Sequence, residues 1–205
     1  MNKIITISRE FGSGGREIGK RLADELNYAY YDKEIITAIA KETGMSEEYI
    51  NNISEKGLYP YAFQFAKSFS VVPTFQSNQT DILVAQQRVI KEIAKKGNCI
   101  IVGRGANVIL KEYNPMNIFV YSDMESKINR CREKAEENEN LSEKEMEKKI
   151  NQINKERKNF HNVISNIEWG EKSNYNLCIN TSNIEIKNII PSLASYIENW
   201  FRGNK

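Results

Sequence analysis

A glycine-rich stretch near the amino terminus has the residue types best suited to binding chemistry. It reads SREFGSGGREIGKRLADEL, from Ser8 to Leu26, and follows a short apolar run. Gly12, Gly14 and Gly15 allow backbone conformations that other residues avoid, so successive N–H groups can point into one concavity. The amphipathic pattern after them predicts a helix, whose positive end favours an anion. We therefore expect a phosphate group to bind here.

The dinucleotide-binding pattern G-x-G-x-x-G matches this stretch only in part. It would begin at Gly12 and Gly14, but its third glycine falls on Glu17. Asp32 lies about where that pattern has an acidic residue for the ribose. Against this match, the four residues from Ser8 onward place a longer excursion before the glycines than a dinucleotide turn uses.

The phosphate-loop (P-loop) pattern G-x-x-x-x-G-K-[ST] is broken as well. Its lysine reaches the β- and γ-phosphates and its hydroxyl holds magnesium. In a match without gaps the lysine position falls on Gly15 and the first glycine on Ser8 or Arg9, and where the pattern has its hydroxyl the chain continues with Arg16 and Glu17. Arg16, the nearest cation, is expected to supply part of the missing charge, and Glu17 offers a carboxylate for Mg²⁺. The predicted ATP-phosphate-binding residues are Gly12, Ser13, Gly14, Gly15, Arg16 and Glu17.

Short apolar runs alternate with amphipathic segments along the chain. The runs typical of buried strands are KIITIS, YAYYD, NCIIVG, MNIFVYS and YNLCINTS, in chain order. Strands separated by helices predict an α/β fold, with a five-stranded parallel sheet covered by helices on both faces. Ligands of such sheets bind beyond the carboxyl ends of the strands, which is where the glycine loop lies.

Two segments interrupt this alternation. Residues 45–79 are less regular and rich in aromatic side chains, and we expect them to face a substrate. Residues 133–158 are dense in Glu, Lys and Asn, which is typical of a solvated helical hairpin. Three S-x-x-E capping-box patterns, which begin at Ser122, Ser142 and Ser182, predict three helix starts.

The composition is that of an ordinary globular protein. The chain has 205 residues, of which 40% are hydrophobic and 27% charged, and this length suits one domain. A formal charge of +2 gives no support for nucleic-acid binding. Cys99, Cys131 and Cys178 are odd in number and widely spaced, so neither a disulfide framework nor a zinc cluster is indicated. No apolar run approaches the ~20 residues of a membrane span, and we expect a cytoplasmic protein without a membrane partner.

With these segments identified, the chain resembles the cytidylate kinase-like branch of the nucleoside monophosphate kinases. The resemblance rests on SREFGSGGREIGKRLA and YYDKE, on VGRGANVIL, on NIFVYSDMESKINRCRE, on INKERKNF and on NLCINTS. Cytidylate kinases carry a G-R-D segment, an R-x-x-R-R helix and an E-R-x-x-x-R segment in the same order. The resemblance implies a three-layer P-loop fold with a monophosphate-binding insert and a helical lid over the phosphates.

The resemblance also implies a division of one domain, residues 1–205, into three parts. These parts are a core of residues 1–44, 80–132 and 171–205, an acceptor-binding insert of about 45–79, and a lid of about 133–170. Arg104 matches an arginine that contacts the acceptor monophosphate, and Asp32 an acidic residue near the acceptor nucleoside. Arg130 and Arg157 match lid arginines that neutralise the transferred phosphoryl group. From the residues alone, Asp32 could equally cap a helix and the arginines could be surface charges.

Besides the missing lysine, two departures from the family pattern bear on activity and on nucleotide specificity. Ala106 stands near the aspartate of the G-R-D segment, and Asn159 or His161 fills the second lid-arginine position. His161 lies in a polar helical stretch and is expected at the surface. The leading hypothesis is a phosphotransferase that uses ATP and Mg²⁺ and acts on a nucleotide or another small acceptor. The alternatives are a nucleotide-binding or regulatory module without chemistry and, more weakly, a dinucleotide-dependent oxidoreductase. No motif identifies the acceptor or the oligomeric state.

Overall fold

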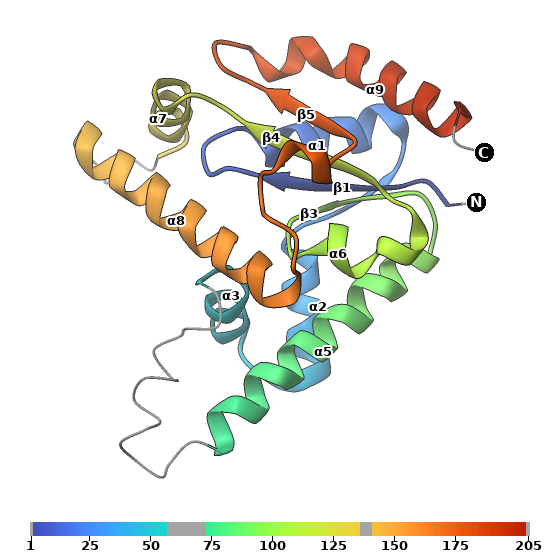
Figure 1. The fold of residues 1–205 in the computed structure, drawn as a ribbon, viewed down its shortest axis with the longest axis vertical. Coiled ribbons are helices and arrows are strands. Elements are labelled where there is room, and N and C mark those ends of the chain that lie inside the picture. Colours follow the sequence, from blue (N-terminus) through green and yellow to red (C-terminus); the bar gives the residue numbers. More distant parts are fainter. Residues whose placement is uncertain (1, 57–72, 136–140, 204–205) are drawn as a thin grey trace.

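A central parallel sheet organises the protein, as a computed structural model shows (Figure 1). The structure describes residues 2–56, 73–135 and 141–203. The strands are β1 (Ile4–Arg9), β2 (Ala29–Tyr31), β3 (Cys99–Val102), β4 (Met116–Tyr121) and β5 (Leu177–Asn180). They lie in the order β2-β3-β1-β4-β5, and every neighbouring pair is parallel. The predicted five-stranded parallel sheet is thereby confirmed.

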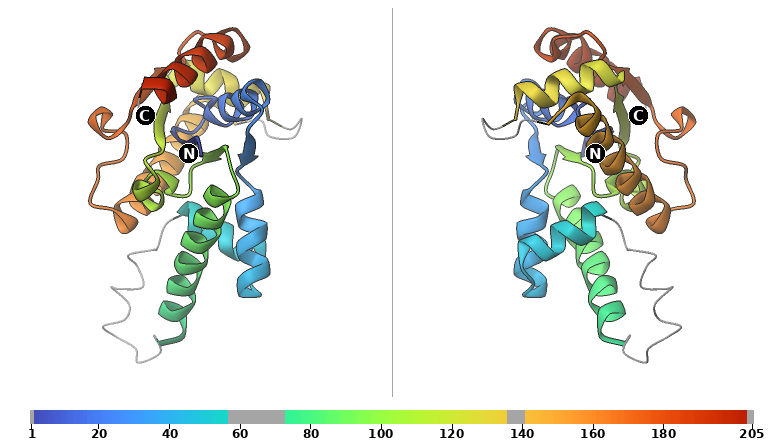
Figure 2. Two further views of the ribbon diagram at one scale, coloured as in Figure 1. Left: turned by 90° about the vertical axis from the view of Figure 1, so that its right-hand side faces the viewer. Right: turned by 90° about the vertical axis from the view of Figure 1, so that its left-hand side faces the viewer.

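Helices cover both faces of this sheet (Figures 1 and 2). They are α1 (Gly15–Leu26), α2 (Glu34–Thr43), α3 (Glu47–Lys56), α5 (Pro73–Lys95), α6 (Ala106–Ile109), α7 (Met124–Glu133), α8 (Glu143–Ile164) and α9 (Ile186–Gly203). Short 3-10 turns lie at Lys111–Tyr113 and Lys172–Asn174. Helices α1 and α9 pack together on one face, whereas α2 and α5 lie side by side on the other. The three-layer α/β prediction is therefore confirmed.

The alternation of side chains along the strands divides the core between the two faces. In β3, Ile100 and Val102 join the apolar cluster under α1 and α9. Cys99 and Ile101, at the positions between them, join the cluster under α2 and α5. Successive side chains of a strand point to opposite faces, so an unbroken apolar run forms a strand that is buried on both sides. Burial also raises the pKa of the Cys99 thiol to about 11, which agrees with a buried rather than a reactive cysteine.

The capping-box predictions have mixed outcomes. Ser142 caps α8 through a complete box with Glu145, as predicted. The prediction for Ser122 is wrong by one residue, because the Asp123 carboxylate caps α7 and accepts a bond from the Ser126 N–H at 2.7 Å.

The prediction that Ser182 caps the last helix is also wrong. Helix α9 begins only at Ile186. The hydroxyl of Ser182 donates instead to Oδ1 of Asn180, at 2.7 Å. A local turn after β5 therefore takes the hydroxyl that the sequence pattern assigned to the helix.

The two segments expected to face the ligands lie near the carboxyl edge of the sheet. Helix α8 passes beside the glycine loop and contacts both α7 and α3 (Figure 1). The predicted insert includes α3 and the start of α5, but its residues 57–72 lie outside the described residues, as do residues 136–140 of the predicted lid. The division into core, insert and lid therefore stays a prediction. Across the described ranges, no helix has the length and apolar character needed to cross a bilayer.

Candidate functional site

The glycine loop connects β1 to α1 at the carboxyl edge of the sheet, as predicted. Gly12 and Gly14 have φ of +77° and +79°, in the left-handed region that favours glycine. The N–H groups of the first turn of α1, which begins at Gly15, have no partner within the helix. Along α1, the N–H of Ile18 is the first that donates to a carbonyl of the loop. Its acceptor is the Gly14 carbonyl, at 3.0 Å. Backbone donors and the positive end of α1 are thus available at the mouth of the loop.

A cavity of about 380 Å³ opens in front of this loop. Seven of the predicted site residues border it: Gly12, Gly14, Gly15, Arg16, Glu17, Arg130 and Arg157. Ser13 does not, because it is fully buried and its hydroxyl donates to the Glu10 carbonyl at 2.8 Å. Lys134, which directly follows α7, and Lys149 of α8 add further positive charge to the wall, which suits an anionic ligand.

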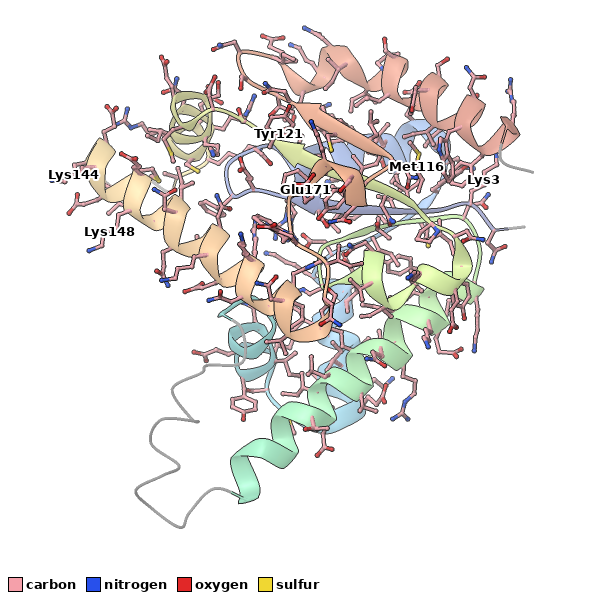
Figure 3. All side chains as sticks on the ribbon, viewed as in Figure 1. Lys3, Met116, Tyr121, Lys144, Lys148 and Glu171 are labelled. Carbon is pink, nitrogen blue, oxygen red and sulfur yellow. The ribbon has the colours of Figure 1, made fainter. Side chains whose placement is uncertain are left out.

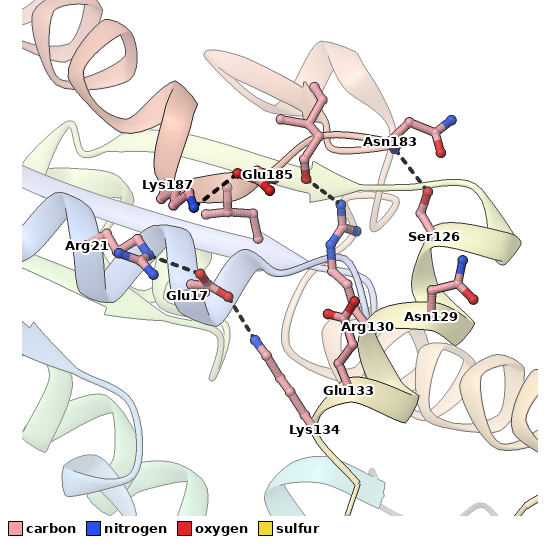
Figure 4. A pocket seen from close by; sticks show the side chains of 12 residues that line it. Glu17, Arg21, Ser126, Asn129, Arg130, Glu133, Lys134, Asn183, Glu185 and Lys187 are labelled. Atoms are coloured by element: carbon pink, nitrogen blue, oxygen red, sulfur yellow. Dashed lines mark hydrogen bonds and ion pairs between the residues drawn. The ribbon is translucent and has the colours of Figure 1, made fainter.

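A second cavity of about 410 Å³ adjoins the first, between α1, α7 and the loop before α9 (Figure 4). Glu17, Arg130 and Lys134 border both cavities. The Glu17 carboxylate accepts bonds from Lys134 Nζ at 2.8 Å and from Arg21 Nε at 3.0 Å. Burial acts to raise the pKa of Glu17, but these two cations outweigh it and the pKa is lowered. Glu17 is therefore an anion that links α1 to the end of α7.

Arg130 of α7 joins the glycine loop to the loop that precedes α9. Its guanidinium donates to the Thr181 carbonyl. It also donates to the Ile184 carbonyl, at 3.2 Å (Figure 4). A longer contact of 3.5 Å reaches the Gly12 carbonyl. Arg130 thus borders both cavities while it is held by backbone oxygens, so its charge has a fixed position next to the loop.

Helix α8 contacts the backbone of the glycine loop directly. Arg157 donates to the Arg9 carbonyl at 2.9 Å, and its guanidinium lies 5.6 Å from the Phe11 ring centroid. Asn154, one turn earlier, accepts a bond from the Phe11 N–H at 2.7 Å. Figure 3 shows the exposed Lys144 and Lys148 on the outer part of the same helix. One side of α8 therefore serves the cavity, and the other faces solvent.

Asp32 lies at the end of β2, where two arginines approach it. Its carboxylate is almost fully buried and forms an ion pair with Arg16, whose Nε lies 2.5 Å from Oδ2. Nη2 of Arg9 lies 4.0 Å from the other oxygen. The structure thus places the Arg16 guanidinium against Asp32, and the approach of Arg9 was not expected from the sequence.

Arg104 follows β3 on the same side of the loop. It is buried, with φ of +57°, and donates to Oδ1 of Asn51 in α3 at 3.2 Å. Its carbonyl accepts a bond from Gln86 of α5 at 2.9 Å. Arg104 also borders a small cavity of about 40 Å³, together with Arg9 and Arg157. Three arginines therefore converge on the side of the loop where the acceptor was expected.

Comparison with known proteins identifies the family. The profile of the cytidylate kinase-like family matches residues 4–183. The chain belongs to the cytidylate kinase-like family. Curated cytidylate kinases from Saccharolobus islandicus are 25% identical over 201 residues, which cover 95% of this chain and 90% of the relative.

Solved structures show the same architecture as this cytidylate kinase-like chain. An uncharacterized protein from Eubacterium ventriosum has a TM-score of 0.70 at 28% identity, over 97% of this chain and 99% of that one. A shikimate kinase from Bacteroides thetaiotaomicron has a TM-score of 0.57 at 15% identity, with coverage of 97% and 99%. This second likeness shows the fold alone. The resemblance inferred from the sequence is confirmed.

The acidic side chains near the cavity suit a magnesium site in which the protein supplies only one or two ligands. Within the described ranges, no three His, Cys, Asp or Glu side chains form a metal-binding group. Mg²⁺ in kinases keeps several waters and is held by one or two carboxylates together with substrate phosphates. Glu17, at the edge of the cavity, fits as one such carboxylate.

His161 of α8 is buried, so the prediction of a surface histidine is wrong. Only 3% of it is exposed, and its ring nitrogens lie 3.2 Å from Nδ2 of Asn107 and 3.1 Å from Oγ of Ser165. Burial lowers the pKa of His161. His161 therefore packs α8 against α6 as a neutral ring.

This burial predicts a pH dependence of stability. The unfolded chain takes up a proton at His161 below about pH 6.5, whereas the folded chain resists it, so the free energy of unfolding falls on acidification. We expect the fall between about pH 7.5 and about pH 5.5 to be larger in the wild type than in His161→Gln. Urea unfolding at both pH values measures it. Equal falls in the two proteins would contradict a buried neutral ring.

Three residues that the motifs did not single out also shape the site. Besides Arg9 and Asn154, Lys127 of α7 is buried and its Nζ donates to the Glu10 carboxylate at 2.9 Å. A Cβ at Gly12 would lie 2.9 Å from the Lys127 carbonyl, so α7 packs closely on the loop. Each of the three lies in a segment that the sequence analysis quoted: Arg9 in the glycine stretch, Lys127 in the α7 segment with Arg130, and Asn154 in INKERKNF with Arg157. Those positions were the signals available.

Proposed function

We propose that this protein is an ATP-dependent phosphotransferase of the nucleoside monophosphate kinase type, which acts on a nucleotide or another small acceptor. One observation carries the proposal. The glycine loop and the start of α1 open on a cavity that is walled by cationic side chains of α7 and α8. Phosphoryl transfer needs such a place, because the reacting group carries negative charge on several oxygens. Membership of the cytidylate kinase-like family supports the same reaction.

We assign the phosphate donor to the two adjoining cavities. The triphosphate lies on the loop from Gly12 to Glu17, and the nucleoside lies in the cavity between α1, α7 and α9. Arg130 borders both, so it meets the phosphates where they enter the nucleoside cavity. ATP supplies the phosphoryl group. Glu17 would hold Mg²⁺, which would neutralise charge on the phosphates, and Lys134 and Arg21 keep this carboxylate ionised at the edge of the cavity.

The acceptor belongs on the opposite side of the loop, next to Arg104 and Asp32. Arg104 is a buried cation that suits an acceptor phosphate, and Arg157 borders both this side and the donor cavity. An acceptor oxygen forms the new bond to phosphorus, the bond to the bridging oxygen of ADP breaks, and the acceptor's proton passes to solvent. Alignment and charge stabilisation suffice for this reaction, so no general base is required.

A second candidate function is a nucleotide-binding module without chemistry. It is favoured by the glycine at the lysine position and by the pairing of Arg16 with Asp32 at 2.5 Å, which turns the expected replacement cation away from the loop.

ADP release in the presence of ATP and Mg²⁺, measured against a panel of nucleoside monophosphates and other small acceptors, tests the proposal. We expect turnover that depends on one class of acceptor. Thermal stabilisation by ATP without ADP release from any acceptor would favour the inactive module. No stabilisation and no turnover would contradict both.

A further inference from the structure

At position 15, lack of space for a side chain, rather than backbone conformation, requires a glycine. It is not among the described glycines with positive φ, so any side chain could adopt its backbone geometry. A Cβ at this position would nevertheless lie 2.5 Å from Cβ and 3.0 Å from Cγ of Arg9. The side chain of Arg9 therefore occupies the space that a lysine at position 15 would need.

The Arg9 side chain runs from the end of β1 across Gly15 toward β2 and β3. Its guanidinium lies next to Gly103, where an added Cβ would overlap Nη1, and 4.0 Å from the Asp32 carboxylate. Only 9% of Arg9 is exposed. Two residues without a side chain, Gly15 and Gly103, thus border the path of one buried cation.

Arg9 borders both the cavity in front of the glycine loop and the small cavity beside Arg104. In the arrangement proposed above, the phosphoryl group passes between these two places. A guanidinium presents several N–H donors in a rigid fork and binds phosphate oxygens in pairs, so this position suits charge stabilisation during transfer.

We propose that Arg9 is a catalytic residue that binds the phosphates of the donor in place of the missing phosphate-loop lysine. In the phosphate-loop pattern a glycine stands at the start of the loop and a lysine at its end. Here Arg9 stands at the start and Gly15 at the end, so cation and glycine have exchanged places. This inference rests on the proposed function for its chemistry, but the binding of a triphosphate by Arg9 does not require turnover.

Arg16 is the other arginine that could replace the lysine, and the structure disfavours it. Its side chain is 53% exposed and its Nε lies 2.5 Å from Asp32. Arg9 approaches the same carboxylate at the longer distance and lies deeper. Replacing each arginine in turn by a neutral residue therefore shows whether the buried or the exposed cation binds the phosphates.

Binding of inorganic tripolyphosphate, measured by calorimetry without metal, tests Arg9 independently of turnover. We expect Arg9→Met to bind tripolyphosphate about ten- to a hundredfold more weakly and Arg9→Lys to recover part of the loss. The control is Arg88→Met, which removes an exposed arginine of α5 that pairs with Glu42. Circular dichroism and melting temperature confirm that each variant is folded. Unchanged binding in Arg9→Met, or a larger loss in Arg16→Met, would overturn the inference.

Exchange of the two residues gives a second, sharper test. Gly15→Lys alone is expected to displace Arg9, whereas Arg9→Gly alone removes the cation. The double variant R9G/G15K restores the usual order and should bind tripolyphosphate at least about tenfold more tightly than Arg9→Gly. The Arg157 bond survives this change because it uses the Arg9 carbonyl. A double variant no better than Arg9→Gly would count against the exchange.

The two proposals can fail separately. If the wild type binds tripolyphosphate through Arg9 but phosphorylates no acceptor, the proposed function fails, whereas the proposed role of Arg9 in phosphate binding stands. If the wild type turns over and Arg9→Met keeps both its rate and its triphosphate affinity, the inference fails and the function stands. Support for both requires a loss in rate of about 100- to 1000-fold in Arg9→Met together with the loss of affinity.

Discussion

Replacement of Arg157 by methionine is expected to lower kcat/KM for phosphoryl transfer by about 100- to 1000-fold. Arg157 places a guanidinium at the junction of the donor cavity and the acceptor side, where charge develops in the transition state. Its bond to the Arg9 carbonyl, at 2.9 Å, also fixes α8 on the glycine loop. Methionine keeps the apolar stem over Phe11 and removes only the charge and the donors. Steady-state ADP release measures the effect.

The adjacent lysine provides a matched control. Lys158 lies on the same helix and carries the same charge, but it is 47% exposed and pairs with Glu168 at 2.8 Å, away from the cavity. We expect Lys158→Met to keep kcat/KM within about twofold of the wild type, as surface pairs contribute little. A comparable loss in both variants would mean that net charge on α8, not the position of Arg157, governs the rate. Full activity of Arg157→Met would exclude Arg157 from catalysis.

The strands were predictable because their signal is local. Each is a short apolar run, and the alternation in β3 shows why such a run must be covered on both faces. The strand order is not local, since β1 lies at the centre only after later strands have paired on either side of it. The helix start at Ser122 failed for a similar reason. Ser122 directly follows the strand, and its N–H donates to the Glu10 carboxylate at 3.3 Å, whereas the next residue, Asp123, caps the helix.

The binding loop was predictable, but the side chains around it were not. Backbone freedom at Gly12 and Gly14 is a property of those residues alone. The position of Arg9 depends on the missing side chain at Gly103, which lies far along the sequence and comes close only because β1 and β3 pair in the sheet. Likewise His161 was expected at the surface because the helical stretch around it is rich in polar residues, although α8 turns it toward Asn107 of α6. Tertiary neighbours, not neighbours in sequence, decide such roles.

Alanine at Gly12 is expected to lower the free energy of unfolding by about 2 to 5 kcal/mol and to abolish tripolyphosphate binding. Two costs combine. The φ of +77° is unfavourable for any residue with a side chain, and the added Cβ would meet the Lys127 carbonyl at 2.9 Å and Sγ of Cys131 at 3.1 Å. The carbonyl belongs to the backbone of α7 and cannot rotate away. Urea unfolding and calorimetry with tripolyphosphate measure the two effects.

Gly44 separates these two costs. It ends α2 with φ of +70°, close to that of Gly12, but an added Cβ there would meet nothing within 4 Å. Gly44→Ala therefore carries only the conformational cost, about 1 to 2 kcal/mol, and should leave tripolyphosphate binding intact. The excess in Gly12→Ala measures how tightly α7 holds the loop. Equal losses of stability, or tripolyphosphate binding retained in Gly12→Ala, would show that the loop can move away from α7 without consequence, and that contact would then have no part in shaping the anion site.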